Sequence, residues 1–183
     1  MLNTLKEYNN ELKKLYDYLE ETDRINIFLC ERTEEELLKN EIRLYRGTTK
    51  KIYDYKLSII TLYGLIEGFI ENIVKRYLEK LSSNIDNYND LPQLLRENHL
   101  NFSADLIKNI DRLSKYRDLS KSHVIKNLYE CVGGNKPYHI NVDAFTYHSA
   151  NFRQETIQDF FKKVGIENII DGLCKKGIFT KYF

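Results

Sequence analysis

Apolar side chains recur every three or four positions between residues 50 and 82. The positions that set this rhythm are Ile59, Tyr63, Ile66, Ile70, Ile73 and Tyr77. Their spacing matches the 3.6-residue period of an α-helix. Three further side chains, Leu62, Leu65 and Phe69, widen the apolar face, and a face this broad is typical of the central helix of a bundle. The pattern therefore predicts one long central helix.

The rest of the chain is also predicted to be mainly helical. Only two prolines and eight glycines occur among 183 residues, so few positions interrupt a helix. We predict N-terminal helices within residues 3–46, core helices within 50–132 and C-terminal helices within 153–176. The segment 133–150 lacks a helical period, and it is either an ordered loop or a short strand pair. The predicted fold is all-α, an up-down helical bundle in which residues 1–183 form a single domain.

Four residues carry local expectations about packing. Ser103 is placed to cap a helix over residues 104–116. Gly64 and Gly68 lie four apart in the long helix, where each costs about 1 kcal/mol relative to alanine. We therefore expect these glycines to allow another helix to pack closely. Glu67 lies between them, and a carboxylate on so apolar a helix needs an Arg, Lys or Tyr partner.

The charge balance limits the classes of partner. The chain has 28 basic and 27 acidic residues, a net charge of +1. A general basic field for nucleic acid is therefore absent, and any contact with RNA or DNA must come from a local patch. The aromatic content consists of 14 Tyr and 9 Phe without Trp. Tyrosine-rich helices often form interfaces because the ring is buried while the hydroxyl stays hydrated.

The sequence predicts a cytoplasmic protein that does not contact a membrane. Its N-terminus is charged throughout and lacks the apolar stretch of a signal peptide. No run approaches 18 uncharged apolar residues. The three cysteines, Cys30, Cys131 and Cys174, are odd in number and widely spaced, which favours reduced thiols over a disulfide framework.

Metal, phosphate-loop and cysteine chemistry are not favoured by the sequence. No two of the four histidines, at positions 99, 123, 139 and 148, have a metal-binding spacing. The run from Gly133 to Lys136 lacks the spacing of a phosphate-binding loop and is interpreted as a helix end. The cysteines lie in apolar helical stretches, where core packing is the better interpretation. We expect no metal and no cofactor.

One stretch suggests catalysis. Arg117 and His123 lie six positions apart, and Asp118 follows the arginine. A histidine can move a proton from or to a ribose hydroxyl, and an arginine can hold a phosphate and stabilise the charge of its transition state. Such a pair suffices for metal-independent RNA cleavage. The alternative is a solvated basic stretch, because an Arg-x(4–6)-His match often arises by chance.

Three further residues are candidate phosphate or RNA contacts. Asn151 and Arg153 lie at a predicted loop-to-helix junction, where a helix N-terminus can bind phosphate. Asn151 is alternatively only the helix N-cap. Lys121 lies in the basic run of residues 108–126.

Two segments resemble the HEPN superfamily, and most closely the RiboL-PSP/MAE-type HEPN proteins of prokaryotes. They are Tyr55–Glu67 (YKLSIITLYGLIE) and His148–Arg153 (HSANFR), the latter followed by Gly165-Ile166. The resemblance covers residues 50–170. It implies a dimeric up-down helical bundle, and a metal-independent endoribonuclease of toxin–antitoxin, abortive-infection or other antiviral systems. Its hallmark is Arg-x(4–6)-His with a polar residue after the arginine, which Arg117, Asp118 and His123 match.

The chain departs from this family pattern in one respect. In similar proteins the Arg-x(4–6)-His run is expected on a later helix, after the segment that corresponds to Asn151–Ile166. No such run follows Gly165. Either the chain ends before the helix that carries the run, which its abrupt aromatic end favours, or Arg117–His123 is the motif at a different place.

Two functions follow from these alternatives. The leading hypothesis is a HEPN-like ribonuclease of a prokaryotic defence or toxin system. Its expected partners are RNA, a second copy of the chain and a cognate antitoxin or defence protein. The alternative is a catalytically incomplete helical module that dimerises or binds a partner protein. The near-zero net charge favours the module, and the local basic run 108–126 favours the nuclease.

Overall fold

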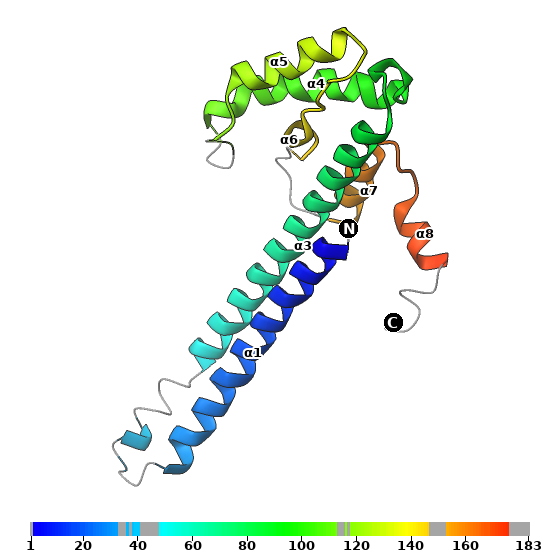
Figure 1. Ribbon diagram of the computed structural model, residues 1–183. Helices are drawn as coiled ribbons and strands as arrows, with labels where there is room; N and C mark the ends of the chain where they lie inside the picture. Colours follow the sequence, from blue (N-terminus) through cyan, green and yellow to red (C-terminus); the bar gives the residue numbers. More distant parts are fainter. Residues whose placement is uncertain are drawn as a thin grey trace. The chain divides into compact units, whose positions relative to one another are not determined.

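The computed structural model describes residues 2–32, 36, 38–40, 48–112, 116, 118–146 and 153–175 (Figure 1). The contacts of the backbone divide the chain into two compact units, Met1–Phe69 and Ile70–Phe183. The long helix α3 (Thr48–Asn84) begins in the first unit and ends in the second. The prediction that residues 1–183 form a single domain stays a prediction.

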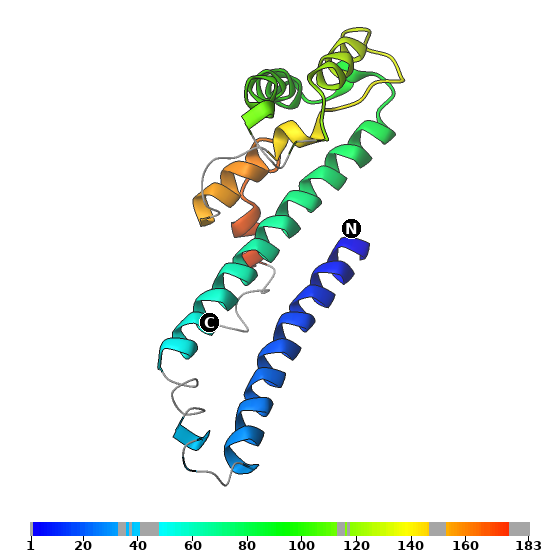
Figure 2. The same cartoon turned by 90° about the vertical axis from the view of Figure 1, so that its left-hand side faces the viewer.

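The first unit consists of α1 (Leu2–Arg32) and the N-terminal part of α3. The two helices run side by side (Figure 2), and the rings of Tyr8 and Phe69 stack between them with centroids 4.5 Å apart. The Nζ atom of Lys50 lies 2.6 Å from the carboxylate of Asp54 one turn later. This i,i+4 pairing supports the first turns of α3.

The N-terminal part of α3 keeps much of its apolar surface exposed. Tyr53 is 67% exposed, Leu57 53% and Ile60 67%. These residues lie at i, i+4 and i+7, so they form one stripe along the helix. Gly64 and Gly68 do not provide close helix packing within the described part of one chain, because a Cβ atom at either position would meet no heavy atom within 4 Å.

The composition of α3 also bears on the membrane prediction. Residues Lys50–Asn84 are long and apolar enough to cross a membrane, with a mean hydropathy of 1.5 over their most apolar window. One such helix is weak evidence for a membrane protein, since a core helix of a soluble protein meets the same criterion. Two carboxylates in this stretch, those of Glu67 and Glu71, engage other groups of the protein.

The second unit holds the end of α3 and a set of shorter helices. These are the 3₁₀ helix η1 (Tyr88–Asp90), α4 (Gln93–Asn109), the 3₁₀ helix η2 (Ile110–Arg112), α5 (Lys121–Val132), α6 (Val142–Phe145), α7 (Gln154–Lys162) and α8 (Ile169–Lys175). The described part of the chain contains helices and no strand, which confirms the all-α prediction. Between Gly133 and Thr146 the chain forms an ordered loop and the short α6, so the alternative of a strand pair is wrong there. A single bridge joins Asn87 to Asn135.

Ser103 does not cap a helix. It lies inside α4, which continues from Gln93 to Asn109 without a break, and its side chain is fully buried. The hydroxyl oxygen accepts a hydrogen bond of 3.1 Å from the side-chain amide of Asn141. A buried serine inside a helix and a serine at a cap have the same local sequence, and here a distant partner satisfies the hydroxyl.

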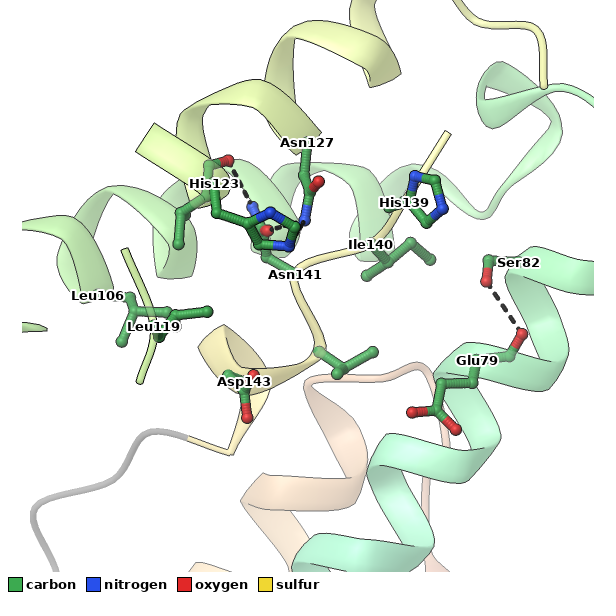
Figure 3. Close-up of a pocket in the computed structure, with 12 residues that line it drawn as sticks. Glu79, Ser82, Leu106, Leu119, His123, Asn127, His139, Ile140, Asn141 and Asp143 are labelled. Carbon is green, nitrogen blue, oxygen red and sulfur yellow. Dashed lines mark hydrogen bonds between the residues drawn. The ribbon is translucent and has the colours of Figure 1, made fainter. Parts of the chain in front are cut away.

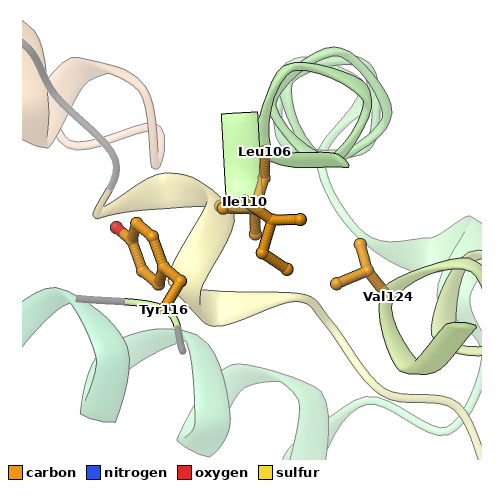
Figure 4. Close-up of a cluster of buried hydrophobic side chains, with 5 residues drawn as sticks. Leu106, Ile110, Tyr116 and Val124 are labelled. Carbon is orange, nitrogen blue, oxygen red and sulfur yellow. The ribbon is translucent and has the colours of Figure 1, made fainter. Parts of the chain in front are cut away.

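A hydrophobic cluster holds the second unit together (Figure 4). It combines side chains from α4, η2, the turn before α5, α5 and α6, namely Leu106, Ile110, Tyr116, Val124 and Ala144. Leu106 and Val124 are completely buried. Because the cluster contacts both α5 and α6, it fixes the positions of the polar residues that these two helices carry.

Candidate functional site

A cavity of about 270 Å³ opens beside α5 (Figure 3). Its wall includes residues of α3, α5 and α6 and of the loop that precedes α6. The chemically active side chains around it are His123, Asn127, His139, Glu79 and Asp143, and the apolar ones include Leu119 and Ile140. All of these residues belong to the second unit.

His123 lies at the start of α5, where local sequence determines its place. Ser120 adopts an extended conformation at the N-cap, and its hydroxyl oxygen accepts a hydrogen bond of 3.1 Å from the backbone N–H of His123. This capping bond starts the helix one residue later. The imidazole is exposed and lines the cavity, as expected for a residue that acts on a ligand.

The other residues of the predicted catalytic motif are placed less favourably. Asp118 lies in an exposed turn and does not line the cavity. Lys121 forms an ion pair with Asp111, which offsets its charge. Arg117 lies outside the described residues. The structure therefore brings His123 to the cavity, and the catalytic roles of His123, Arg117 and Asp118 all stay predictions.

Asn127 links His123 to the protein interior. Its side-chain N–H group donates a hydrogen bond of 2.8 Å to Oδ1 of Asn141 and lies 3.4 Å from Nε2 of His123. The Nδ2 group of Asn141 donates to the carbonyl oxygen of Val124, which can only accept. The amide of Asn141 is therefore fixed, with Oδ1 toward Asn127, and Asn127 must present its N–H group to His123.

A buried histidine holds the backbone at Asn141. Nε2 of His99 accepts a hydrogen bond of 2.9 Å from the backbone N–H of Asn141, so the ring proton is on Nδ1, which lies 2.9 Å from the hydroxyl of Tyr88. His99 is 1% exposed. Burial disfavours the charged ring and lowers the pKa of His99 to about 4. Burial likewise raises the pKa of Tyr88.

His139 occupies the loop before α6 and is anchored on α5. Its Nδ1 atom lies 3.0 Å from Oε2 of Glu130. The hydrogen bond from His139 lowers the pKa of Glu130, and the ammonium of Lys126, 3.7 Å from Oε1, contributes in the same direction. Glu130 is thus a carboxylate at neutral pH and accepts the Nδ1 proton of the ring. The side chain of His139 is 66% exposed.

Two carboxylates lie on the other side of the cavity from these imidazoles (Figure 3). Asp143, at the start of α6, forms a half-buried salt bridge of 2.6 Å with Lys75 of α3. Glu79 lines the cavity one turn further along α3 and is exposed. The described wall of the cavity therefore carries no unpaired cation, and a phosphate bound here would need an arginine or lysine from elsewhere.

The second predicted cluster is described only in part. Arg153 occupies the N-cap position of α7, is exposed and forms no capping hydrogen bond through its side chain. Asn151 lies outside the described residues. It is not the N-cap of α7, because the helix begins at Gln154 with Arg153 before it. Arg153 and Lys121 are exposed or half-buried cations on the surface of the second unit.

Metal and cysteine chemistry find no support in the described part of the chain. Among these residues no group of three or more His, Cys, Asp or Glu side chains is arranged to hold a metal ion. Cys131 is buried and its thiol lies 3.6 Å from the carbonyl oxygen of His139. Burial raises the pKa of this thiol to about 11, so it stays protonated and unreactive. The side chains of Cys30 and Cys174 lie outside the described residues.

Sequence reasoning identified His123 and missed three polar neighbours. Asn127 lies four positions after His123, which on a helix places both side chains on one face, so its spacing was a usable signal. Asn141 and His139 follow the glycine turn after α5 in a segment without periodicity. No sequence signal connects that segment to the cavity.

Comparison with known proteins gives one match. The profile of the family described as RiboL-PSP-HEPN matches residues 3–173 of the chain. No curated protein matches, and no solved structure matches.

Proposed function

The chain belongs to the RiboL-PSP-HEPN family, and on that basis we propose that it is a metal-independent endoribonuclease. We propose further that it acts in a prokaryotic toxin–antitoxin, abortive-infection or antiviral defence system in the cytoplasm. The observation that carries the proposal is the position of His123, whose exposed imidazole lines a cavity and contacts the polar network through Asn127. A histidine in this setting can transfer protons at neutral pH.

Each residue of the motif has a distinct part in the proposed reaction. His123 is the proton-transfer group, Arg117 holds the scissile phosphate and Asp118 orients the pair. The 2′-hydroxyl of the RNA attacks the adjacent phosphorus and leaves a 2′,3′-cyclic phosphate. Because the described wall of the cavity has no unpaired cation, Arg117 has to supply the positive charge. Lys121, Asn151 and Arg153 are proposed contacts to the RNA backbone.

A second copy of the chain is the proposed partner of the exposed α3 stripe. Tyr53, Leu57 and Ile60 in this stripe are each more than half exposed. Gly64 is the next residue on the same face of α3, and the space beside it is open. Small residues let helix backbones approach closely. A chain with a net charge of +1 is weakly repelled by its own copy. A symmetric pairing of two α3 helices satisfies these conditions. A cognate antitoxin or defence protein is a further proposed partner.

One observation favours the second candidate function, a catalytically incomplete module that binds a partner protein. The cavity carries Glu79 and Asp143, and carboxylates repel the phosphates of RNA. The nuclease requires Arg117 to outweigh these charges at the cavity, whereas the module does not. Cleavage measurements therefore distinguish the two candidates directly.

The test is cleavage of an end-labelled structured RNA by the purified protein in excess EDTA, with analysis of the product ends. The nuclease leaves 2′,3′-cyclic phosphate, and both Arg117→Ala and His123→Ala lose cleavage by about 10²–10⁴-fold. His123 is exposed, so its removal leaves the fold intact, which circular dichroism checks. Lys14→Ala, at an exposed lysine of α1 outside the basic run, is the control and keeps full activity.

The outcomes separate the candidates. Full activity of His123→Ala would remove this residue from the mechanism. Products with a 3′-hydroxyl, or loss of cleavage in EDTA, would indicate a different chemistry. A folded protein that cleaves no RNA would leave the partner-binding module as the function.

A further inference from the structure

We propose that His139, held by Glu130, is a second catalytic residue of the cavity and accepts the proton of the attacking 2′-hydroxyl. This inference rests on the proposed ribonuclease function. It addresses a requirement of that reaction which His123 alone does not meet. Two protons move during cleavage, one away from the 2′ oxygen and one onto the departing 5′ oxygen.

The hydrogen bond to Glu130 determines which nitrogen of His139 is free. A carboxylate can only accept, so the Nδ1 atom that lies 3.0 Å from Oε2 of Glu130 carries the proton. In the neutral ring, Nε2 therefore has a lone pair. Among the described residues, Nε2 has no hydrogen-bond partner, and the ring lines the cavity. A carboxylate that holds one nitrogen of an imidazole, with the other free for a substrate, is the arrangement of a general base.

The protein contacts the unprotonated nitrogen of His123, whereas in His139 it contacts the protonated one. The Nε2 atom of His123 faces the N–H group of Asn127 at 3.4 Å, so in the neutral ring the proton is on Nδ1. The lone pair of His123 is directed at a protein donor, and the ring presents an N–H group to a ligand. Neutral His123 is therefore suited to donate a hydrogen bond, and it can give a proton only as an imidazolium, whereas His139 is the ring with a lone pair to receive a proton.

The two rings together complete the reaction. Nε2 of His139 takes the proton of the 2′-hydroxyl, and the 2′ oxygen forms a bond to phosphorus. The bond from phosphorus to the 5′ oxygen breaks, and that oxygen leaves with the electron pair. The imidazolium form of His123, in which Nε2 is also protonated and no longer accepts from Asn127, gives that oxygen one proton from Nδ1. The products are a 2′,3′-cyclic phosphate and a 5′-hydroxyl, with His139 protonated and His123 neutral, and exchange with water resets both rings.

Charged and titratable side chains of both signs lie near His139. Those that surround it on α5, or share its cavity from α3 and α6, are Glu130, Lys126, His123, Glu79, Asp143 and Lys75. Asp143 and Lys75 offset each other, and Lys126 partly offsets Glu130. Glu79 is exposed on the wall of the same cavity and forms no ion pair with another described residue.

The first part of the test is the pH dependence of the cleavage rate between pH 5 and 9. Wild type should lose rate on the acidic side as the base becomes protonated. His139→Ala should be about 10²–10⁴-fold slower and should lose that acidic limb. Glu130→Gln should be slower by about 10- to 100-fold, because the tautomer is no longer fixed. Tyr129→Ala is the matched control, since Tyr129 precedes Glu130 on α5, is 79% exposed and does not line the cavity, and it keeps the wild-type profile.

The second part separates the base from the acid. An RNA with sulfur in place of the 5′ bridging oxygen has a leaving group that departs without a proton. His123→Ala should cleave this substrate at close to the wild-type rate, whereas His139→Ala should stay impaired. If the sulfur substrate restores both variants equally, or if His139→Ala is fully active on ordinary RNA, the assignment of His139 is wrong while the nuclease stands. If the folded wild type cleaves neither substrate, the nuclease and this assignment fall together.

Discussion

The backbone N–H of Asn141 donates a hydrogen bond of 2.9 Å to Nε2 of the buried imidazole of His99. This bond requires an unprotonated nitrogen, so it exists only while His99 is neutral. It joins α4 to the loop that carries both Asn141 and His139. The state of one buried ring therefore controls the position of residues that line the cavity.

We predict that the protein loses stability as the pH falls through the acidic range. Burial lowers the pKa of His99 to about 4 from 6.5. The stabilisation from keeping the ring neutral is fully present above pH about 6.5 and is lost as the pH falls toward 4. Between pH 7.5 and 4.5 the loss amounts to about 2–3 kcal/mol. Urea unfolding at both pH values measures it.

The variant His99→Gln isolates this contribution. It lacks the titrating ring, so its unfolding free energy should change by about 2–3 kcal/mol less between the two pH values than that of wild type. The other groups titrate equally in both proteins, and their contribution cancels in the comparison. An identical pH dependence in wild type and variant would show that His99 is not the group responsible.

We predict that the side chain of Asn141 contributes more to the free energy of unfolding than an ordinary hydrogen-bonding side chain does. Asn141→Ala removes the partners of Asn127, Ser103 and the carbonyl oxygen of Val124 at once. Buried polar groups without partners are costly, and the free energy of unfolding should fall by about 2–4 kcal/mol. Asn135→Ala, an exposed change in the same loop, should cost less than about 1 kcal/mol. Equal losses in chemical denaturation would contradict the special role of the buried network.

Phe145 is expected to be a main anchor of α6. Its ring is 1% exposed and stands edge-on against Phe102, with centroids 5.5 Å apart. Phe145→Ala should lower the free energy of unfolding by about 3–5 kcal/mol, because it removes buried area and leaves a cavity. Tyr129→Ala, at a side chain that is 79% exposed, should change it by less than about 0.5 kcal/mol. Thermal unfolding of the two variants side by side makes the comparison.

A charge in the α3 stripe should abolish the proposed dimer. Ile60→Glu places a carboxylate in the middle of an apolar contact and should convert the dimer to a monomer in light scattering. Val132→Glu on α5 is the matched control, since Val132 is 83% exposed and lies outside the stripe; it should stay dimeric. A wild-type protein that is monomeric at high concentration, or a dimer lost only in Val132→Glu, would place the interface elsewhere or exclude it.

The position of the long helix α3 follows from the sequence by itself. The 3.6-residue period of apolar side chains predicted a long helix over residues 50–82, and α3 covers Thr48–Asn84. Ser120 precedes α5 with a cap that local chemistry favours. These features depend on residues close in the chain, whose relative positions the backbone of a helix fixes. Short segments of sequence also indicated the family. The match over residues 3–173 confirms this resemblance.

The tertiary structure decided which of these residues work together. Ser103 was predicted to cap a helix, but Asn141 satisfies its hydroxyl inside α4. His123, Glu79 and His139 are far apart in sequence and share one cavity. Whether two distant side chains meet depends on how helices pack and where a loop returns, and local sequence patterns do not contain that information. For the same reason, only the fold separates a histidine whose lone pair faces a protein donor from one whose lone pair faces the cavity.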